Sequence, residues 1–178
     1  MLYCFKINCH VVIKYDGKLS LKYKIYNMIT IEDFKIKHSN KVRFIGLDLG
    51  SKRIGVSICD ERQSIATPFK TINKTNTNEL IDKLKIIIKD NNIGGIIVGN
   101  PVNMDGSLGR SAQSVNDVAS NISKSIDLPV ILWDERLSTV GAFNLSSLLD
   151  VNVSKRVKTI DQNAAAFILQ GAIDFLNN

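Results

Sequence analysis

The feature that most constrains the fold is a pair of short apolar segments joined by a tight turn, with one carboxylate in the first. Residues 42–49 and 54–59 are rich in β-branched and other apolar side chains, and Gly50 lies between them. This pattern predicts a β-hairpin. Asp48 lies near the end of the first strand, where burying a carboxylate is costly unless a cation or hydrogen-bond donors compensate it. The hairpin therefore presents an acid at a strand end.

The rest of the chain alternates between strand and helix patterns. A third strand at 64–72 contains Pro68, which favours an edge position. The remaining predicted strands are 96–100 and 129–133, and the predicted helices are 78–91, 109–126, 138–149 and 161–176. The order predicts an α/β fold in which a mixed five-stranded sheet is flanked by helices.

Helix ends are predicted from capping residues and from glycines. The asparagine pair Asn91 and Asn92, with Gly94 and Gly95 after it, is expected to close the helix at 78–91, and Ser138 is expected to begin the helix at 138–149. Thr159 is expected to cap the last helix, which leaves 150–159 as a polar, basic connection. In that arrangement Asp161 lies in the first helical turn.

The basic charge of the chain is concentrated at its N-terminus. The whole sequence carries a net charge of +6, and residues 1–41 hold most of it. We therefore divide the chain into an N-terminal extension, 1–41, with little regular structure, and a single folded domain, 42–178. Met28 is an alternative start. Because the body is nearly neutral, a phosphate-binding surface there requires local clusters of basic residues.

Cysteine usage and hydropathy bear on the compartment. The three cysteines have no paired spacing, which favours a reducing compartment. There is no apolar run of the roughly 18 residues that span a bilayer, and no secretory signal pattern. We expect a cytoplasmic protein that does not associate with membranes.

The scarcity of histidine limits the chemistry of the body. After residue 41 the chain has no histidine and a single cysteine, Cys59. Serine–histidine or cysteine–histidine catalysis and zinc sites of the histidine–cysteine type are therefore excluded there. Oxygen ligands remain, and these suit Mg²⁺ or Mn²⁺.

Acidic residues on three separate predicted elements provide such ligands: Asp48, the adjacent Asp134 and Glu135, and Asp161. Together they indicate metal-dependent phosphodiester chemistry. Each has a simpler interpretation. Asp48 could accept hydrogen bonds from its own turn, and Asp161 could complement a helix dipole. Asp134 and Glu135 face opposite ways if both continue the strand, so one of them reaches the site and the other could pair with Arg136.

Basic residues near these acids are candidate contacts for phosphate groups. They are Lys52, Arg53, Arg110 and Arg136, together with the cluster of Lys155 and Arg156. Any one of them could equally be a solvated surface charge. The loop at 100–109 could bind a nucleic-acid backbone through its N–H groups or simply connect a strand to a helix. Trp133 is expected in the core.

Four segments, in order, resemble the YqgF/RuvX family, which is similar to Holliday-junction resolvases. They are GLDLGSKRIGVSICD, IIVGNPVNMDGSLG, LPVILWDERLST and the helix IDQNAAAFILQGAIDFL. The resemblance covers most of residues 43–176. It implies a ribonuclease H-like fold and a cytoplasmic, metal-dependent nuclease that matures the 5′ end of pre-16S ribosomal RNA.

The resemblance also implies roles for particular residues. Asp48 would be the metal ligand on the first strand, Glu135 with Asp134 beside it would supply the second acid, and Asp161 the last. The basic residues of the SKR and DER segments would contact phosphate. The chain departs from the family at Asn100, where leucine is usual, and in its N-terminal extension.

The residues leave other functions open. A resolvase of four-way DNA junctions would use the same acids and would be a dimer, because two symmetric cuts need two sites. A sugar kinase or actin-like ATPase would need a second domain that the chain is too short to hold. A non-catalytic nucleic-acid-binding module would not need all three acids. The expected partners are pre-16S RNA or branched DNA, with ribosomal precursor particles, bound by a monomer or homodimer.

Overall fold

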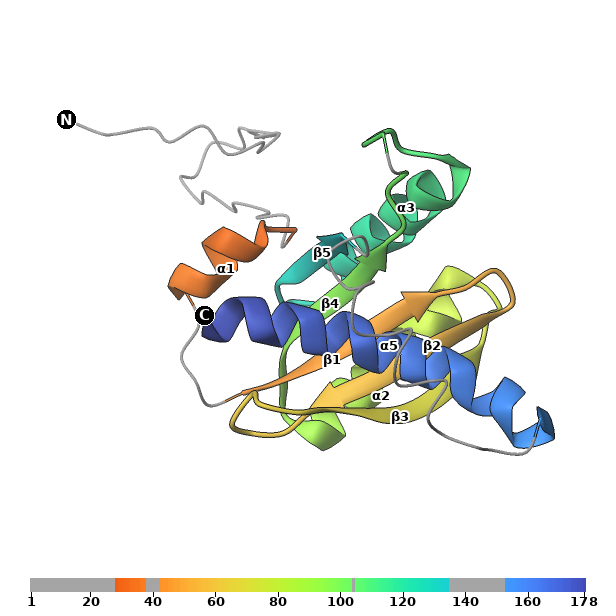
Figure 1. Ribbon diagram of the computed structural model, residues 1–178, viewed down its shortest axis with the longest axis horizontal. Helices are drawn as coiled ribbons and strands as arrows, with labels where there is room; N and C mark the ends of the chain where they lie inside the picture. Colours follow the sequence, from red (N-terminus) through yellow and green to blue (C-terminus); the bar gives the residue numbers. More distant parts are fainter. Residues whose placement is uncertain (1–27, 38–41, 104, 135–152) are drawn as a thin grey trace, which may run out of the picture.

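Five strands form one mixed sheet. The computed structural model describes residues 28–37, 42–103, 105–134 and 153–178 (Figure 1). The strands are β1 (Arg43–Leu49), β2 (Arg53–Cys59), β3 (Ala66–Asn73), β4 (Ile93–Asn100) and β5 (Val130–Asp134), in the order β3-β2-β1-β4-β5. β1, β2 and β3 pair antiparallel, whereas β1, β4 and β5 pair parallel. The predicted mixed five-stranded sheet is confirmed.

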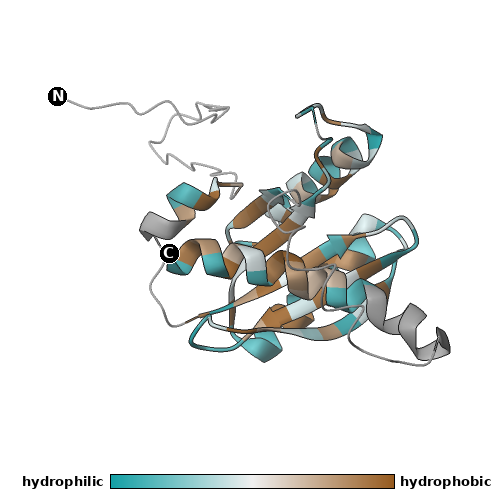
Figure 2. Cartoon of the chain, in the orientation of Figure 1, coloured by the Kyte–Doolittle hydropathy of each residue, from teal (hydrophilic) through white to brown (hydrophobic). Residues whose placement is uncertain are grey.

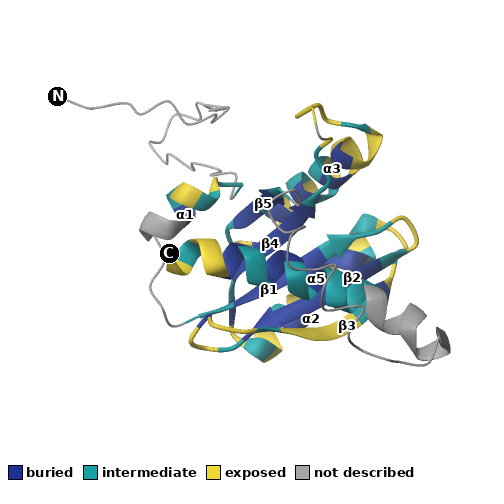
Figure 3. Cartoon of the chain, in the orientation of Figure 1, coloured by how far each residue is buried: buried dark blue, intermediate teal, exposed yellow. Residues whose placement is uncertain are grey.

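Helices cover both faces of this sheet. They are α1 (Ile31–Lys37), α2 (Thr77–Asn91), α3 (Arg110–Ser125) and α5 (Val153–Asn177). One buried cluster joins the sheet to α2 and α3, and a second joins it to α5 and α1. Because side chains alternate along a strand, Leu47 packs in the first cluster and Phe44 in the second. Figures 2 and 3 show the apolar, buried strands between the helices.

The boundary between α2 and β4 agrees with the prediction at the asparagine pair and differs from it at the glycines. α2 ends at Asn91 and is capped by Asn92, which adopts the left-handed conformation (φ 53°), whereas Gly94 and Gly95 lie inside β4. A Cβ atom on Gly95 would lie 3.0 Å from the Phe34 ring and 3.2 Å from the Phe44 ring. The glycine therefore leaves room for two aromatic rings and does not end a helix.

The last helix begins earlier than predicted. α5 starts at Val153, so Thr159 lies inside it and the expected connection at 150–159 is wrong from residue 153 onward. The sequence from 153 to 160 contains no glycine or proline, so nothing in it stops a helix. Asp161 consequently lies more than two turns from the helix start, too far to complement the dipole there.

Residues 28–37 pack against the body of the protein. Phe34 in α1 is fully buried, and its ring meets that of Phe44 edge-on at 5.0 Å. The N–H of Ile29 donates to the carbonyl oxygen of Val130 at 3.2 Å, which extends the sheet edge locally. The sequence shows no period over so short a helix. The division of the chain at residues 41 and 42 stays a prediction.

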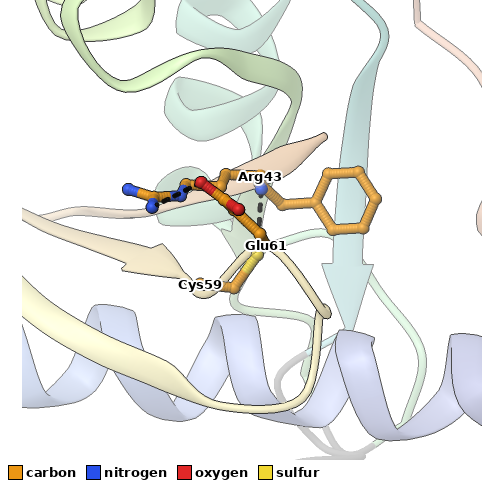
Figure 4. Close-up of polar contacts among 4 residues, drawn as sticks. Arg43, Cys59 and Glu61 are labelled. Atoms are coloured by element: carbon orange, nitrogen blue, oxygen red, sulfur yellow. Dashed lines mark hydrogen bonds and ion pairs between the residues drawn. The ribbon is translucent and has the colours of Figure 1, made fainter. Parts of the chain in front are cut away.

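Two polar contacts stabilise the end of the sheet where β1 begins (Figure 4). Arg43 forms a 3.0 Å ion pair with Glu61, and the Cys59 sulfur accepts a hydrogen bond from the N–H of Phe44. Burial raises the pKa of the Cys59 thiol, so it stays protonated and acts as part of the core.

The predicted helix at 138–149, with its cap Ser138, lies outside the described residues. Among the helices that the structure does describe, none is both long enough and apolar enough to cross a lipid bilayer.

Candidate active site

Three parallel strands end at the same edge of the sheet, and each brings a polar residue there. Asp48 lies near the end of β1, Asn100 ends β4 and Asp134 ends β5. β4 lies between the other two. Because neighbouring strands are about 4.8 Å apart, the ends of β1 and β5 are separated by about 10 Å. This edge is where the sequence places the acids.

Gly55 brings helix α5 against the strand beside Asp48. Gly55 is the β2 partner of Asp48, and a Cβ atom added to it would lie 1.8 Å from the carbonyl oxygen of Asp161. About one helical turn further on, the Ser57 hydroxyl donates to the carbonyl oxygen of Ala165 at 2.8 Å. The backbone of α5 therefore rests on β2 at Asp161, which brings two of the predicted acids together.

Asp48 is in an environment that disfavours its charge. Burial, and to a smaller extent the negative charge of Asp161, raise the pKa of the Asp48 carboxyl above its usual 3.8. Two carboxylates held close together on a partly buried surface repel each other when both are charged, and a nearby positive charge would offset this repulsion. A cation bound between them would supply that charge.

The raised pKa of Asp48 predicts how stability depends on pH. Above pH 3.8 the unfolded chain loses this proton before the native state does, so the free energy of unfolding falls as pH rises through the window up to the native pKa. Asp48→Asn cannot titrate. In chelator-treated samples we expect the variant to gain stability relative to the wild type through this window, in urea unfolding at successive pH values. A constant difference at every pH would show that the Asp48 pKa is not raised by folding.

Arg53 does not lie where a simple phosphate contact would. Its Nε atom is 2.7 Å from Asp161 Oδ2, and the two side chains are 38% and 20% exposed. Asp161 Oδ2 is buried and receives no hydrogen bond from any of the described residues. The contact is therefore a close pairing of charges without a directed hydrogen bond.

Asp134 and Asp48 lie on opposite faces of the sheet, because successive side chains along a strand alternate between the faces. Trp133 packs in the α5 cluster, so Asp134 points to the opposite face, as does its β4 partner Asn100. Leu47 packs on that opposite face as well, which places Asp48 on the α5 side. Glu135, the next residue after Asp134, lies outside the described residues. The roles of Asp134 and of Glu135 as the second acid both stay predictions.

The other predicted phosphate contacts are scattered around this edge. Lys52 is exposed in the turn between β1 and β2, and Arg110 is exposed at the start of α3. Lys155 and Arg156 lie on the first turns of α5. Arg136 falls outside the described ranges. The structure brings Lys52 near Asp48 through their shared hairpin and leaves the rest untested.

Two residues at this edge were missed from the sequence. Lys74 fastens the β1–β2 turn: its N–H donates to the carbonyl oxygen of Lys52 at 2.9 Å, and its Nζ lies 3.5 Å from the carbonyl oxygen of Gly50. The pairing of Arg53 with Asn73 makes residue 74 a neighbour of the turn, so a correct β2–β3 register would have found it. Gly55 also carried a signal, since a glycine inside a strand often marks a close backbone approach.

The donors at this edge fit a hard divalent cation only in part. Asp48 and Asp161 offer carboxylate oxygens, and the buried Oδ2 of Asp161 has no hydrogen bond to lose. Such oxygens are what Mg²⁺ and Mn²⁺ prefer. No group of three metal-binding side chains occurs within the described part of the chain. A third ligand therefore has to come from elsewhere, and Glu135 is the candidate.

Comparison with known proteins identifies the family. The sequence model of the RuvX family, described as "Holliday junction resolvase", matches residues 42–175. The chain belongs to the RuvX family. The match spans the hairpin, the sheet edge and α5, so all of the candidate acids lie inside the RuvX region.

Two relatives share most of this RuvX chain. A protein of Pelagibacter ubique (strain HTCC1062) is 99% identical over 151 residues, which are 85% of this chain and all of the relative. One of Cereibacter sphaeroides (strain ATCC 17025 / ATH 2.4.3) is 43% identical over 148 residues, 83% of this chain and 92% of the relative. Both bear the name "Putative pre-16S rRNA nuclease".

A solved structure supports the fold of this RuvX protein. RuvC of T. thermophilus in complex with Holliday junction substrate aligns with a TM-score of 0.52 at 10% identity, over 75% of this chain and 94% of that one. At this identity the likeness concerns the fold alone. The ribonuclease H-like fold predicted from the motifs is confirmed.

Proposed function

We propose that this protein is a cytoplasmic, metal-dependent nuclease that processes the 5′ end of pre-16S ribosomal RNA. The observation that carries the proposal is that Asp48 and Asp161 lie close together at the end of β1. The close approach of α5 to Gly55 brings them there. The names of the two relatives, of which the chain covers 92% or more, supply the substrate.

The proposed site would hold Mg²⁺ or Mn²⁺ through Asp48, Asp161 and Glu135. A divalent cation bound by these acids lowers the pKa of a water molecule and offsets negative charge at the scissile phosphate. Asp48 and Asp161 fix the position of this charge, because one lies on the rigid central strand and the other on a helix docked against it. Asp134 is the alternative to Glu135 as the second acid.

The chain's basic residues would hold the RNA backbone around this site. Lys52 is exposed in the turn that follows Asp48, and Arg110 is exposed at the start of α3. Arg136, Lys155 and Arg156 would extend the positive surface. Contacts of this kind bind phosphate and read no bases, so substrate choice would depend on RNA shape.

Resolution of four-way DNA junctions is the second candidate. It is favoured by the description of the matching family as a Holliday junction resolvase. The same acids would serve, since both substrates present phosphodiesters. A resolvase would have to act as a homodimer, whereas RNA trimming is open to a monomer.

The experiment offers purified protein a labelled pre-16S leader RNA and a four-way DNA junction side by side, with Mn²⁺, and uses Asp48→Asn as the control. We expect cleavage of the RNA at its 5′ leader and no cleavage by the variant. Paired symmetric cuts in the junction, with intact RNA, would favour the resolvase. Cleavage of neither would leave a nucleic-acid-binding module as the better interpretation.

A further inference from the structure

We propose that Arg53 is a positioning residue that serves as an internal counter-cation for Asp161, and that a divalent cation entering the site has to compete with it for that carboxylate. The inference rests on the proposed function, because it concerns the same site. It replaces the sequence-based prediction that Arg53 contacts phosphate.

The position of Arg53 follows from the strand that carries it. Residues two apart on a strand share a face, so Arg53 lies on the face of Gly55, against which the backbone of Asp161 rests. Arg53 Nε reaches within 2.7 Å of Asp161 Oδ2. Asp48 is the β1 partner of Gly55. The guanidinium therefore belongs to the same small region as both carboxylates.

The charges explain why a cation is needed there. Without Arg53, Asp48 and Asp161 would be held close together on a partly buried surface with no described cation paired to Asp161. A guanidinium is charged at every physiological pH, so it offsets this repulsion permanently. In the absence of metal, it stabilises the arrangement of the two acids.

The ion pair between Arg53 and Asp161 is also of a kind that a metal ion could replace. Asp161 Oδ2 is buried yet receives no hydrogen bond, although Arg53 Nε is close. A guanidinium often binds a carboxylate through two parallel hydrogen bonds, and this pair lacks that bidentate geometry. A metal ion that binds this oxygen would therefore displace an ion pair but no directed hydrogen bond from the described residues, and the positive charge of Arg53 would oppose its approach.

A role as phosphate contact fits the geometry less well. Arg53 would have to leave Asp161 to reach a phosphate, which would expose the two carboxylates to each other. Lys52 precedes it in the same turn and its side chain is exposed, so it reaches the substrate without breaking an ion pair. The two adjacent basic residues therefore have separate tasks, and this difference can be tested.

The test is Mn²⁺ titration by calorimetry of the full chain without nucleic acid. It compares the wild type with Arg53→Gln and Arg53→Lys, and uses Lys85→Gln, at an exposed lysine of α2 on the other face of the sheet, as the matched control for loss of one positive charge. We expect Arg53→Gln to bind Mn²⁺ about tenfold more tightly, the effect of removing one nearby like charge. Arg53→Lys should stay close to the wild type, and Lys85→Gln should bind Mn²⁺ unchanged.

A second readout separates competition from simple damage. Without metal, Arg53→Gln should unfold at a lower temperature than the wild type, and Mn²⁺ should raise its melting temperature by more. Unchanged or weaker Mn²⁺ binding by Arg53→Gln, beside normal binding by the wild type, would overturn this proposal alone. If neither protein binds Mn²⁺, the metal-dependent function fails with it.

Discussion

Asp48→Asn is expected to lower phosphodiester cleavage by about a thousandfold, which corresponds to about 4 kcal/mol of lost transition-state stabilisation. An amide is nearly the same size as a carboxylate but carries no charge to hold a divalent cation. Because burial and Asp161 disfavour the charged form of Asp48, the variant should fold at neutral pH and be at least as stable as the wild type in the absence of metal. Single-turnover cleavage assays and urea unfolding measure the two effects.

The matched control is Asp82→Asn, which removes one exposed carboxylate from α2. It should cleave and unfold like the wild type. Cleavage by Asp48→Asn within a few-fold of the wild type would exclude Asp48 from the chemistry. A loss of activity with a matching loss of stability would instead assign Asp48 a structural role.

Gly55→Ala is expected to lower the free energy of unfolding by about 3 kcal/mol or more. The added Cβ would lie 1.8 Å from the carbonyl oxygen of Asp161, and backbone cannot rotate away as a side chain can. Either α5 moves off β2 or the strand bends. Both outcomes shift Asp161 away from Asp48, so residual folded protein should also cleave poorly. Urea unfolding gives the first effect, and cleavage by the folded fraction gives the second.

Gly109→Ala is the control for the loss of a glycine. Gly109 has φ −68°, and its Cβ would meet the Asn103 amide at 3.4 Å, an ordinary contact. We expect little change in stability from it. If Gly55→Ala were equally mild, the close docking of α5 on β2 would be wrong.

Much of the fold followed from local patterns. Alternation and the turn at Gly50 predicted the hairpin, and the apolar positions Leu80, Ile81 and Leu84 predicted α2. Local patterns could not show that β4 would pair with β1 and separate it from β5, because strand order depends on packing between distant segments. Gly94 and Gly95 were mistaken for a helix end for the same reason: the aromatic rings that Gly95 accommodates come from α1 and β1.

The sequence predicted which acids belong to the candidate site better than it predicted how they are arranged. Asp48 was conspicuous as a carboxylate on an apolar strand, and Asp161 entered the same set as an acid at the start of a predicted helix. The sequence did not reveal that Arg53 pairs with Asp161, since this depends on where α5 crosses β2. It also left open which of Asp134 and Glu135 supplies the second acid, and this choice stays a prediction because Glu135 lies outside the described residues.

The docking of α5 on the hairpin has a consequence for the time at which the protein becomes active. The hairpin is complete by Cys59, whereas its contact with Ala165 joins residues 108 positions apart. Asp161 can reach Asp48 only after nearly the whole chain exists and its final helix has folded back onto strands made early. An unfinished or C-terminally truncated chain therefore lacks one wall of the proposed catalytic site.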